Sequence, residues 1–247
     1  MTALAIALAA AIGFTMGLLG GGGSIIVVPA LTYLMGFETK SAVVTSLAVV
    51  GLAAAAGALS SFSRGTLPVL PAVIVGLTTM IGAYGGARIG ALLADATQMA
   101  ILAAVMIAAG AGMAYQSLRA SESQAPSVAA RPVLLGATGI GLGVVTGMVG
   151  VGGGFLIVPA LVIAGGLQMR DAASASLLAI ALGTAAGLAG YAGRVPLAWG
   201  FVLPFAAVAA LGTMMGGLVA HRVPHRLLQR IFASAVITIA VYILTRG

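Results

Sequence analysis

The sequence has no cysteine, which excludes disulfides, thiolate metal sites and cysteine nucleophiles. Charge is also scarce: Asp, Glu, Lys and Arg make up 6% of the chain, and only four residues are acidic. These are Glu38, Asp95, Glu122 and Asp171, all near the ends of apolar segments. An acid isolated inside a membrane segment is the usual sign of a proton relay, and none is found. Glu38 is the one acid that we retain as a candidate coupling residue.

Catalytic patterns are missing as well. No Ser/His/Asp order, zinc signature or carboxylate pair is found, so the sequence predicts no enzyme, no metal site and no cofactor. His221 and His225 have the spacing of a helical metal pair but lack a third ligand. The net charge is +7, yet the basic residues lie between apolar stretches and form no run. This pattern argues against nucleic-acid binding and is typical of membrane loops.

Long apolar stretches are what the chain does contain. It is 61% hydrophobic, with a mean hydropathy of +1.20, and its apolar stretches repeatedly exceed the roughly 18 residues of a membrane-helix candidate. Its 37 glycines would weaken soluble helices but allow helices in lipid to approach closely. We therefore predict an all-α polytopic protein in a lipid bilayer, without a soluble domain.

The chain also contains an internal repeat. Residues 17–31 read GLLGGGGSIIVVPAL and residues 147–161 read GMVGVGGGFLIVPAL, so that eight of fifteen positions are identical. We predict one membrane domain over 1–247, with a first repeat at 1–118, a polar linker at 119–132 and a second repeat at 133–247. Paired glycine breaks in the two halves of a membrane chain indicate a substrate site.

Each repeat is expected to contain a broken pair of half-helices followed by three transmembrane helices. The predicted segments are 3–19, 25–36, 41–62, 67–92 and 98–118, then 133–149, 155–167, 171–193, 197–220 and 227–245. The second segment of each half is too short to cross a bilayer, since about 12 residues span about 18 Å of a core that is about 30 Å thick. We expect Ser24, Ser41 and Asp171 to cap helix N-termini.

Two topologies remain open. If each pair of half-helices is one broken span, the chain has eight spans and parallel repeats, and the basic residues divide six against five between the faces. If each pair is a hairpin, the second repeat is inverted and the division becomes seven against four. The inverted arrangement agrees better with the excess of basic residues on cytoplasmic loops, and it places both termini outside the cytoplasm.

The glycine breaks are predicted to bind an anion. The first amides of a new helix lack acceptors, and the helix dipole adds about half a positive charge at that end. Glycine also lets backbone N–H groups approach an oxyanion closely. The candidate substrate-binding residues are Gly20, Gly22, Gly23, Ser24, Thr45, Ser46, Tyr84, Gly150, Gly152, Gly153, Gly154 and Ser176.

Each of these residues has a structural alternative. The glycines could serve only for close helix packing. The hydroxyls of Thr45 and Ser46 could bond back to helix carbonyls or face the site. Glu38 could be an interfacial partner for Lys40 or a helix-entry charge. Arg64, which could attract anions at a vestibule, could instead be an interfacial anchor.

The repeated motif resembles that of a known family. GxxGxGGGxxxVPxL, complete at 147–161 and nearly so at 17–31, together with AVVTSL at 42–47, is similar to the TauE/SafE sulfite exporter family. The resemblance implies transport of sulfur-containing anions such as sulfite or sulfonates across a bacterial or archaeal inner membrane, with export proposed for several members. The second copy departs at Val151, Gly154 and Ala175, where the first has Gly21, Ser24 and Thr45.

The sequence thus predicts a secondary transporter, an exporter by resemblance, that moves a small sulfur-containing anion by alternating access. An anion channel of the same architecture and an importer of another small oxyanion are the alternatives. The partners expected are the anion and the bilayer. The oligomeric state stays open, a homodimer included.

Overall fold

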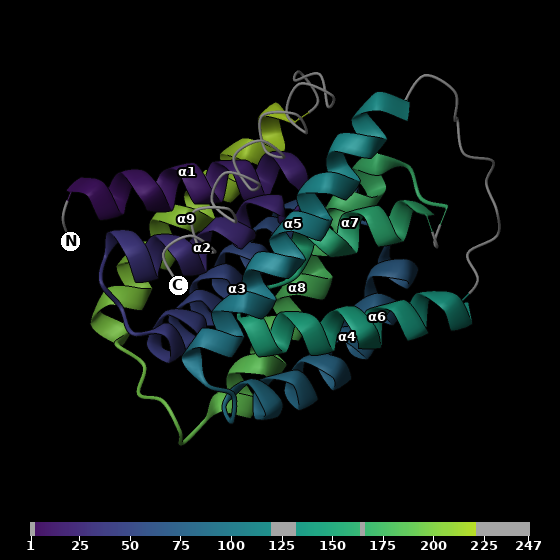
Figure 1. Ribbon diagram of the computed structural model, residues 1–247. Coiled ribbons are helices and arrows are strands. Elements are labelled where there is room, and N and C mark those ends of the chain that lie inside the picture. The colour runs from purple at the N-terminus through teal and green to yellow at the C-terminus, as the bar shows by residue number, and fades with distance from the viewer. Residues whose placement is uncertain (1–2, 120–131, 164–165, 221–247) are drawn as a thin grey trace.

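The computed structural model describes residues 3–119, 132–163 and 166–220, and this part of the chain is helical without strands (Figure 1). The first half contains α1 (Ala3–Leu19), η1 (Gly22–Ile26), α2 (Val27–Pro29), η2 (Ala30–Leu34), α3 (Thr39–Ser63), α4 (Val69–Gly90) and α5 (Asp95–Arg119). The second half contains α6 (Pro132–Val149), α7 (Gly154–Ile163), α8 (Met169–Tyr191) and α9 (Trp199–Val219). The predicted all-α class is confirmed for these residues.

The predicted segments up to residue 220 coincide with these helices to within about four residues at each end, the accuracy expected from hydropathy. The last one, 227–245, lies outside the described residues, as do His221 and His225. The segment Gly22–Leu34 changes from 3-10 (η1) through α (α2) to π (η2) geometry. Pro29, which has no N–H to donate, lies at the change from α to π.

The three predicted caps are wrong. The residue before η1 is Gly21, in the left-handed region at φ 95°, and Ser24 lies inside the helix. The helix α3 follows Glu38, so Ser41 is already within its first turn. Likewise α8 follows Gln168 and includes Asp171. Neither start has a hydrogen bond from its capping side chain, and both approaches are extended backbone.

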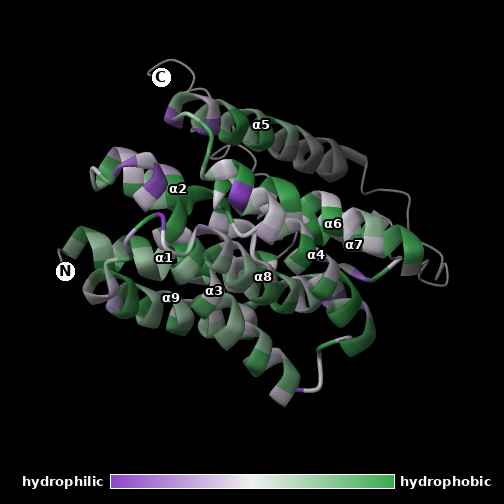
Figure 2. Ribbon diagram, turned by 90° about the horizontal axis from the view of Figure 1, so that it is seen from below, coloured by the Kyte–Doolittle hydropathy of each residue, from purple (hydrophilic) through white to green (hydrophobic). Residues whose placement is uncertain are grey.

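The helices α3, α4, α8 and α9 are long and apolar enough to cross a membrane. In Figure 2 hydrophobic colour predominates along the ribbons, and the hydrophilic segments lie mostly near helix ends and connections. Large apolar side chains such as Leu70, Ile81 and Leu211 are more than 60% exposed. Such exposure is expected where lipid covers the surface.

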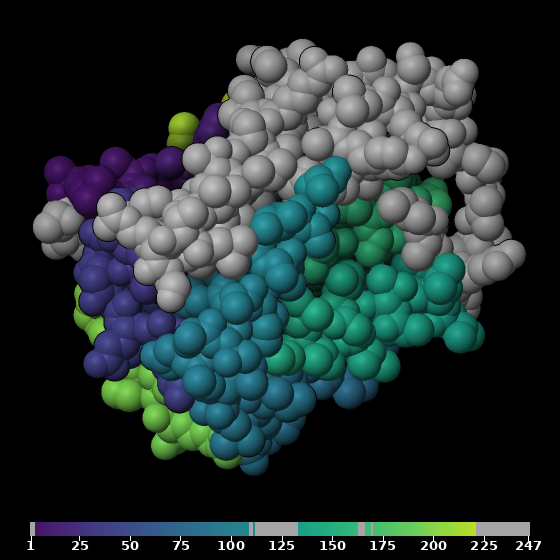
Figure 3. Space-filling model, in the orientation of Figure 1, coloured from purple at the N-terminus to yellow at the C-terminus, as the bar shows by residue number. Residues whose placement is uncertain are grey.

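The two halves are interleaved. The first helix of each half packs against the fourth helix of the other, α1 on α9 and α6 on α4. The long helices cross between the halves too, because α3 contacts α8 and α9, and α8 contacts α4. In the space-filling view, α9 emerges beside first-half residues, and α6 abuts α5 (Figure 3).

Glycine pairs at GxxxG spacing permit these crossings. In α1 and α9, Gly17 packs on the backbone of Gly216 and Gly217. In α6 and α4, Gly143 packs on Gly82, and a Cβ on Gly143 would lie 3.0 Å from the Gly82 Cα. Here the close-packing interpretation of glycine holds, since backbone meets backbone as in GxxxG membrane dimers.

Candidate functional site

The two glycine breaks lie against each other. A Cβ added to Gly154 would lie 2.7 Å from the Cα of Gly21, so the turns touch through their backbones. Both turns use left-handed glycines: Gly20 and Gly21 have φ of 66° and 95°, and Gly150, Gly152 and Gly153 have φ of 70° to 76°. Residues with a Cβ are strained in this region, which accounts for the glycine runs.

Each turn is seated on the long helix of the other half. Gly20 packs on the backbone of Ala173 in α8, and Gly150 packs on the backbone of Val43 in α3. These contacts are equivalent in the repeat, because 43 and 173 differ by the same offset as 20 and 150. The pair of breaks is therefore a joint structure that neither half makes alone.

New helical segments begin at both turns. Gly22–Leu34 starts beside Gly21, and α7 starts at Gly154. The first amides of each segment have no intrahelical acceptor, so two partly positive helix ends converge where the breaks meet. Ser24 is fully buried, and its Oγ donates to the Gly21 carbonyl at 2.8 Å, which holds the first turn closed on itself.

Two serines at equivalent positions behave differently. The Ser176 Oγ donates to the Gly20 carbonyl and, at 2.8 Å, to the Ala173 carbonyl, so it ties α8 to the first turn. Ser46 is fully buried, and its Oγ has no hydrogen-bond partner within residues 3–119, 132–163 and 166–220. Ser46 lies on α3 between Val43 and Val50, which contact Gly150 and Gly152. The second turn therefore has an unpartnered hydroxyl beside it.

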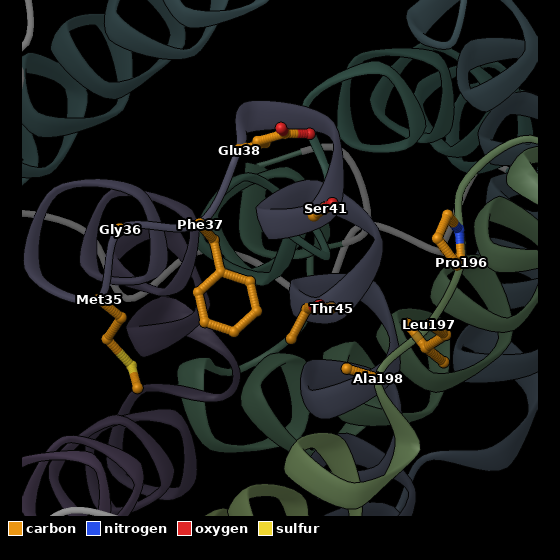
Figure 4. Close-up of a pocket in the computed structure, with 9 residues that line it drawn as sticks. All are labelled: Met35, Gly36, Phe37, Glu38, Ser41, Thr45, Pro196, Leu197 and Ala198. Atoms are coloured by element: carbon orange, nitrogen blue, oxygen red, sulfur yellow. The ribbon is translucent and has the colours of Figure 1, made fainter.

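A cavity of about 460 Å³ opens on another side of α3. It is lined by Met35, Gly36, Phe37, Glu38, Ser41, Thr45, Pro196, Leu197 and Ala198. In Figure 4, Phe37 and Thr45 project towards each other, with Glu38 and Ser41 on one side and residues 196–198 opposite. Thr45 is only 2% exposed and lies next to Ser46 along the helix, so the cavity reaches the part of α3 that also carries Ser46.

Three further residues of the predicted site, Gly22, Gly153 and Tyr84, lie in different surroundings. Gly22 packs on the Leu19 side chain, and Gly153 on Thr146, both within their own turns. Tyr84 is 45% exposed on α4, where the Arg88 guanidinium carbon lies 5.7 Å from its ring centre. The structure does not bring Tyr84 together with the glycine breaks.

The charges near the cavity form one contact. Lys40 Nζ lies 4.0 Å from Asp95 Oδ1, and Glu38 directly precedes α3, the helix-entry position that was one of its structural alternatives. Glu38 is exposed at the cavity and is its one charged residue. Among the described residues, no group of three or more histidine, aspartate or glutamate side chains could hold a metal ion.

Sequence reasoning missed a polar cluster beneath the second turn. The Gln98 Nε2 of α5 donates to the Met148 carbonyl at 2.5 Å and to the Tyr191 hydroxyl at 3.1 Å. The available signal was Gln98 itself, a lone amide at the start of an otherwise apolar segment.

Comparisons with known proteins agree along nearly the whole chain. The family model "Sulfite exporter TauE/SafE" matches residues 5–243. A "Probable membrane transporter protein" of Xylella fastidiosa (strain 9a5c) is 32% identical over 240 residues, covering 96% of this chain and 92% of the relative. The "Probable membrane transporter protein YdhB" of Bacillus subtilis (strain 168) is 28% identical over 232 residues, covering 91% of each. No solved structure matches.

Proposed function

The chain belongs to the sulfite exporter TauE/SafE family of membrane proteins, and on that premise we propose that it is a secondary transporter of a small sulfur-containing anion. Sulfite or an organosulfonate is the substrate class, and export is the direction. The anion binds where the two glycine turns meet, and alternating access exposes this place to either side of the membrane.

The observation that carries the proposal is the unpartnered Ser46 hydroxyl beside the paired turns. A buried hydroxyl without a partner costs free energy, and native proteins keep few of them. An anion at the helix ends would accept hydrogen bonds from the Ser46 hydroxyl and from the backbone N–H groups of Gly154 and Phe155. The site needs no buried cation, because two helix dipoles supply the positive potential.

The cavity at Thr45 is the entry route in this proposal. It opens beside the start of α3 and ends at a hydroxyl next to Ser46. Its volume of about 460 Å³ exceeds what a sulfite ion needs and would admit a small organosulfonate with water. Glu38 at the mouth is the candidate coupling residue.

We also propose that the repeats, 1–118 and 133–247, are inverted. The rings of Phe37 and Phe201 lie 5.2 Å apart, so α9 begins beside the start of α3. The ends of the same helices meet too, since the Cβ position of Gly217 lies 3.2 Å from Arg64 Nη2. Thus α9 runs parallel to α3.

The helix equivalent to α9 in the first half is α4, which runs antiparallel to α3. Its direction follows from α8, because Gly76 meets Leu182 and Gly190 meets Ala87 (α4 parallel to α8), whereas Gly51 meets Thr184 and Gly57 meets Leu177 (α8 antiparallel to α3). If the repeats were parallel, α9 would run in the direction of α4, antiparallel to α3. If the repeats are inverted, α9 runs parallel to α3. The direction of α9 therefore supports inversion. In this proposal the termini lie outside the cytoplasm of a bacterial inner membrane, because the inverted arrangement then puts the larger share of basic residues on the cytoplasmic face.

A ligand panel tests the function. The purified protein is titrated with sulfite, thiosulfate, sulfate, taurine, isethionate and sulfoacetate. Binding is followed by the fluorescence of Trp199, the chain's one tryptophan, which is next to the cavity residue Ala198 in the sequence. We expect saturable binding of one of the sulfur anions and counterflow in proteoliposomes. Single-channel currents would favour the channel alternative. No binding across the panel would refute the substrate class.

A further inference from the structure

The Gln98 side chain joins α5 to two second-half helices. It is 1% exposed, and its Nε2 donates both to the Met148 carbonyl of α6 and to the Tyr191 hydroxyl of α8. The Tyr191 hydroxyl in turn donates to the Met148 carbonyl at 3.2 Å. Two donors from two helices therefore converge on one carbonyl.

That carbonyl lies at the end of α6, immediately before the second glycine turn. The last four carbonyls of a helix have no donor within the helix. The Thr146 carbonyl accepts from the Gly150 N–H at 2.8 Å, and the Met148 carbonyl accepts from Gln98 and Tyr191. The contact thus fixes the direction in which the chain leaves α6.

At the first turn the described residues make a different contact. The positions equivalent to Met148 and Tyr191 are Leu18 and Ser61, the position equivalent to Gln98 lies outside the described residues, and the Ser176 Oγ donates to the Gly20 carbonyl. Each turn is therefore anchored by a different polar group. The second turn, the one beside the unpartnered Ser46, depends on α5 for its anchor.

Packing alone does not account for an amide at this position. The Gln98 Oε1 is buried without a partner among the described residues, which is unfavourable compared with an apolar side chain of the same shape. The close approach is tight as well, because any Cβ at Gly90 would overlap the Tyr191 hydroxyl.

We propose that Gln98 is a positioning residue that acts with Tyr191 to hold the second glycine turn in its anion-binding geometry. Its effect on transport rests on the proposed function, since the second turn is half of the proposed site. The local effect on the turn does not, and it is measurable without any substrate.

The test uses single thiols, which need no background removal because the chain has no cysteine. Val151→Cys reports on the second turn and Val27→Cys on the first returning segment; both valines are buried. Labelling by a membrane-impermeant maleimide is compared in the full-length protein with and without Gln98→Met. This substitution keeps the length of the side chain but removes both hydrogen bonds that Gln98 Nε2 donates. Met99→Leu, at the adjacent buried position of α5, is the matched control.

We expect Gln98→Met to speed labelling at position 151 by about three- to tenfold, the range for losing one to two hydrogen bonds between membrane helices. Labelling at position 27 and in Met99→Leu should not change. Tyr191→Phe, which retains the ring, should give a smaller rise at 151. Unchanged labelling at 151 in both variants, or an equal rise at 27, would overturn the proposal.

Transport supplies the second readout. With sulfite as the probe in proteoliposomes, Gln98→Met should raise KM by a similar factor and leave the maximal rate within about twofold, because a displaced turn weakens binding first. A lower maximal rate at unchanged KM would contradict positioning. If the wild type transports neither sulfite nor any other anion of the panel, the proposed function fails while the labelling result still decides the role of Gln98.

Discussion

The serine pair gives the sharpest test of the proposed site, because Ser46 and Ser176 occupy equivalent positions of the repeat and only one is hydrogen-bonded. The perturbation is alanine at either position, which removes one hydroxyl from a buried face of a helix. The two variants have the same chemistry and the same burial, so each is the matched control of the other.

Their effects on stability should differ. Ser176→Ala loses the bond to the Gly20 carbonyl, and hydrogen bonds between membrane helices average about 0.6 kcal/mol, with a maximum near 1.7 kcal/mol. Ser46→Ala removes a hydroxyl that has no partner, so stability should stay constant or rise by up to about 1 kcal/mol. Thermal unfolding in detergent, followed by Trp199 fluorescence, measures the difference.

Their effects on binding should differ in the opposite sense. A hydrogen bond to a charged group contributes about 1.5–3 kcal/mol, so Ser46→Ala should weaken anion binding by about ten- to a hundredfold. The Ser176 hydroxyl is already committed to the Gly20 carbonyl, and its loss should change the dissociation constant by less than about threefold. Equal losses of affinity in the two variants, or unchanged affinity in Ser46→Ala, would refute the assignment of Ser46 to the anion.

Three further predictions follow from other parts of the structure. Gly86→Ala should lower the free energy of unfolding by about 1–3 kcal/mol, because its Cβ would overlap a carbonyl of α6. Gly85→Ala, whose Cβ would meet nothing within 4 Å, should be neutral or stabilising, and unfolding in detergent compares the two variants. Glu38→Gln should tighten anion binding about twofold at low ionic strength and not at high salt, because it removes one repulsive charge eight residues before Ser46, about 12 Å along the helix. Titrations at two salt concentrations check this. Lys40→Ala should change stability by less than about 1 kcal/mol, because its contact with Asp95 is long and exposed; a larger loss in the unfolding assay would show that the pair is structural.

Local features were predictable because they depend on neighbouring residues. The helices follow the apolar runs, and the turns follow the glycines that alone adopt φ near +70° without strain. The caps were mispredicted for a related reason: Ser41 and Asp171 are typical capping residues, yet the extended backbone ends earlier, at Glu38 and Gln168. A boundary of this kind is set by how the preceding loop packs.

The candidate site was predictable only in part. The sequence located both turns and the hydroxyls of the first half, and the structure brings Gly21 and Gly154 into contact. Tyr84 lies among glycines in the sequence. In the structure Gly82 and Gly86 pack on the backbone of α6, while the Tyr84 side chain is exposed. Gln98 was overlooked because its partners lie 50 and 93 residues away.

The sequence by itself determined that this chain is a helical membrane protein of two repeats, each broken at a glycine turn, because apolar length and glycine runs act locally. Only the tertiary structure decided that each turn packs on a long helix of the other half. Packing across the halves seats Gly20 on α8 and Gly150 on α3, and it gives Ser176 a partner while leaving Ser46 without one. Equivalent residues thereby acquire different roles, because a hydrogen bond depends on the position of its acceptor in space.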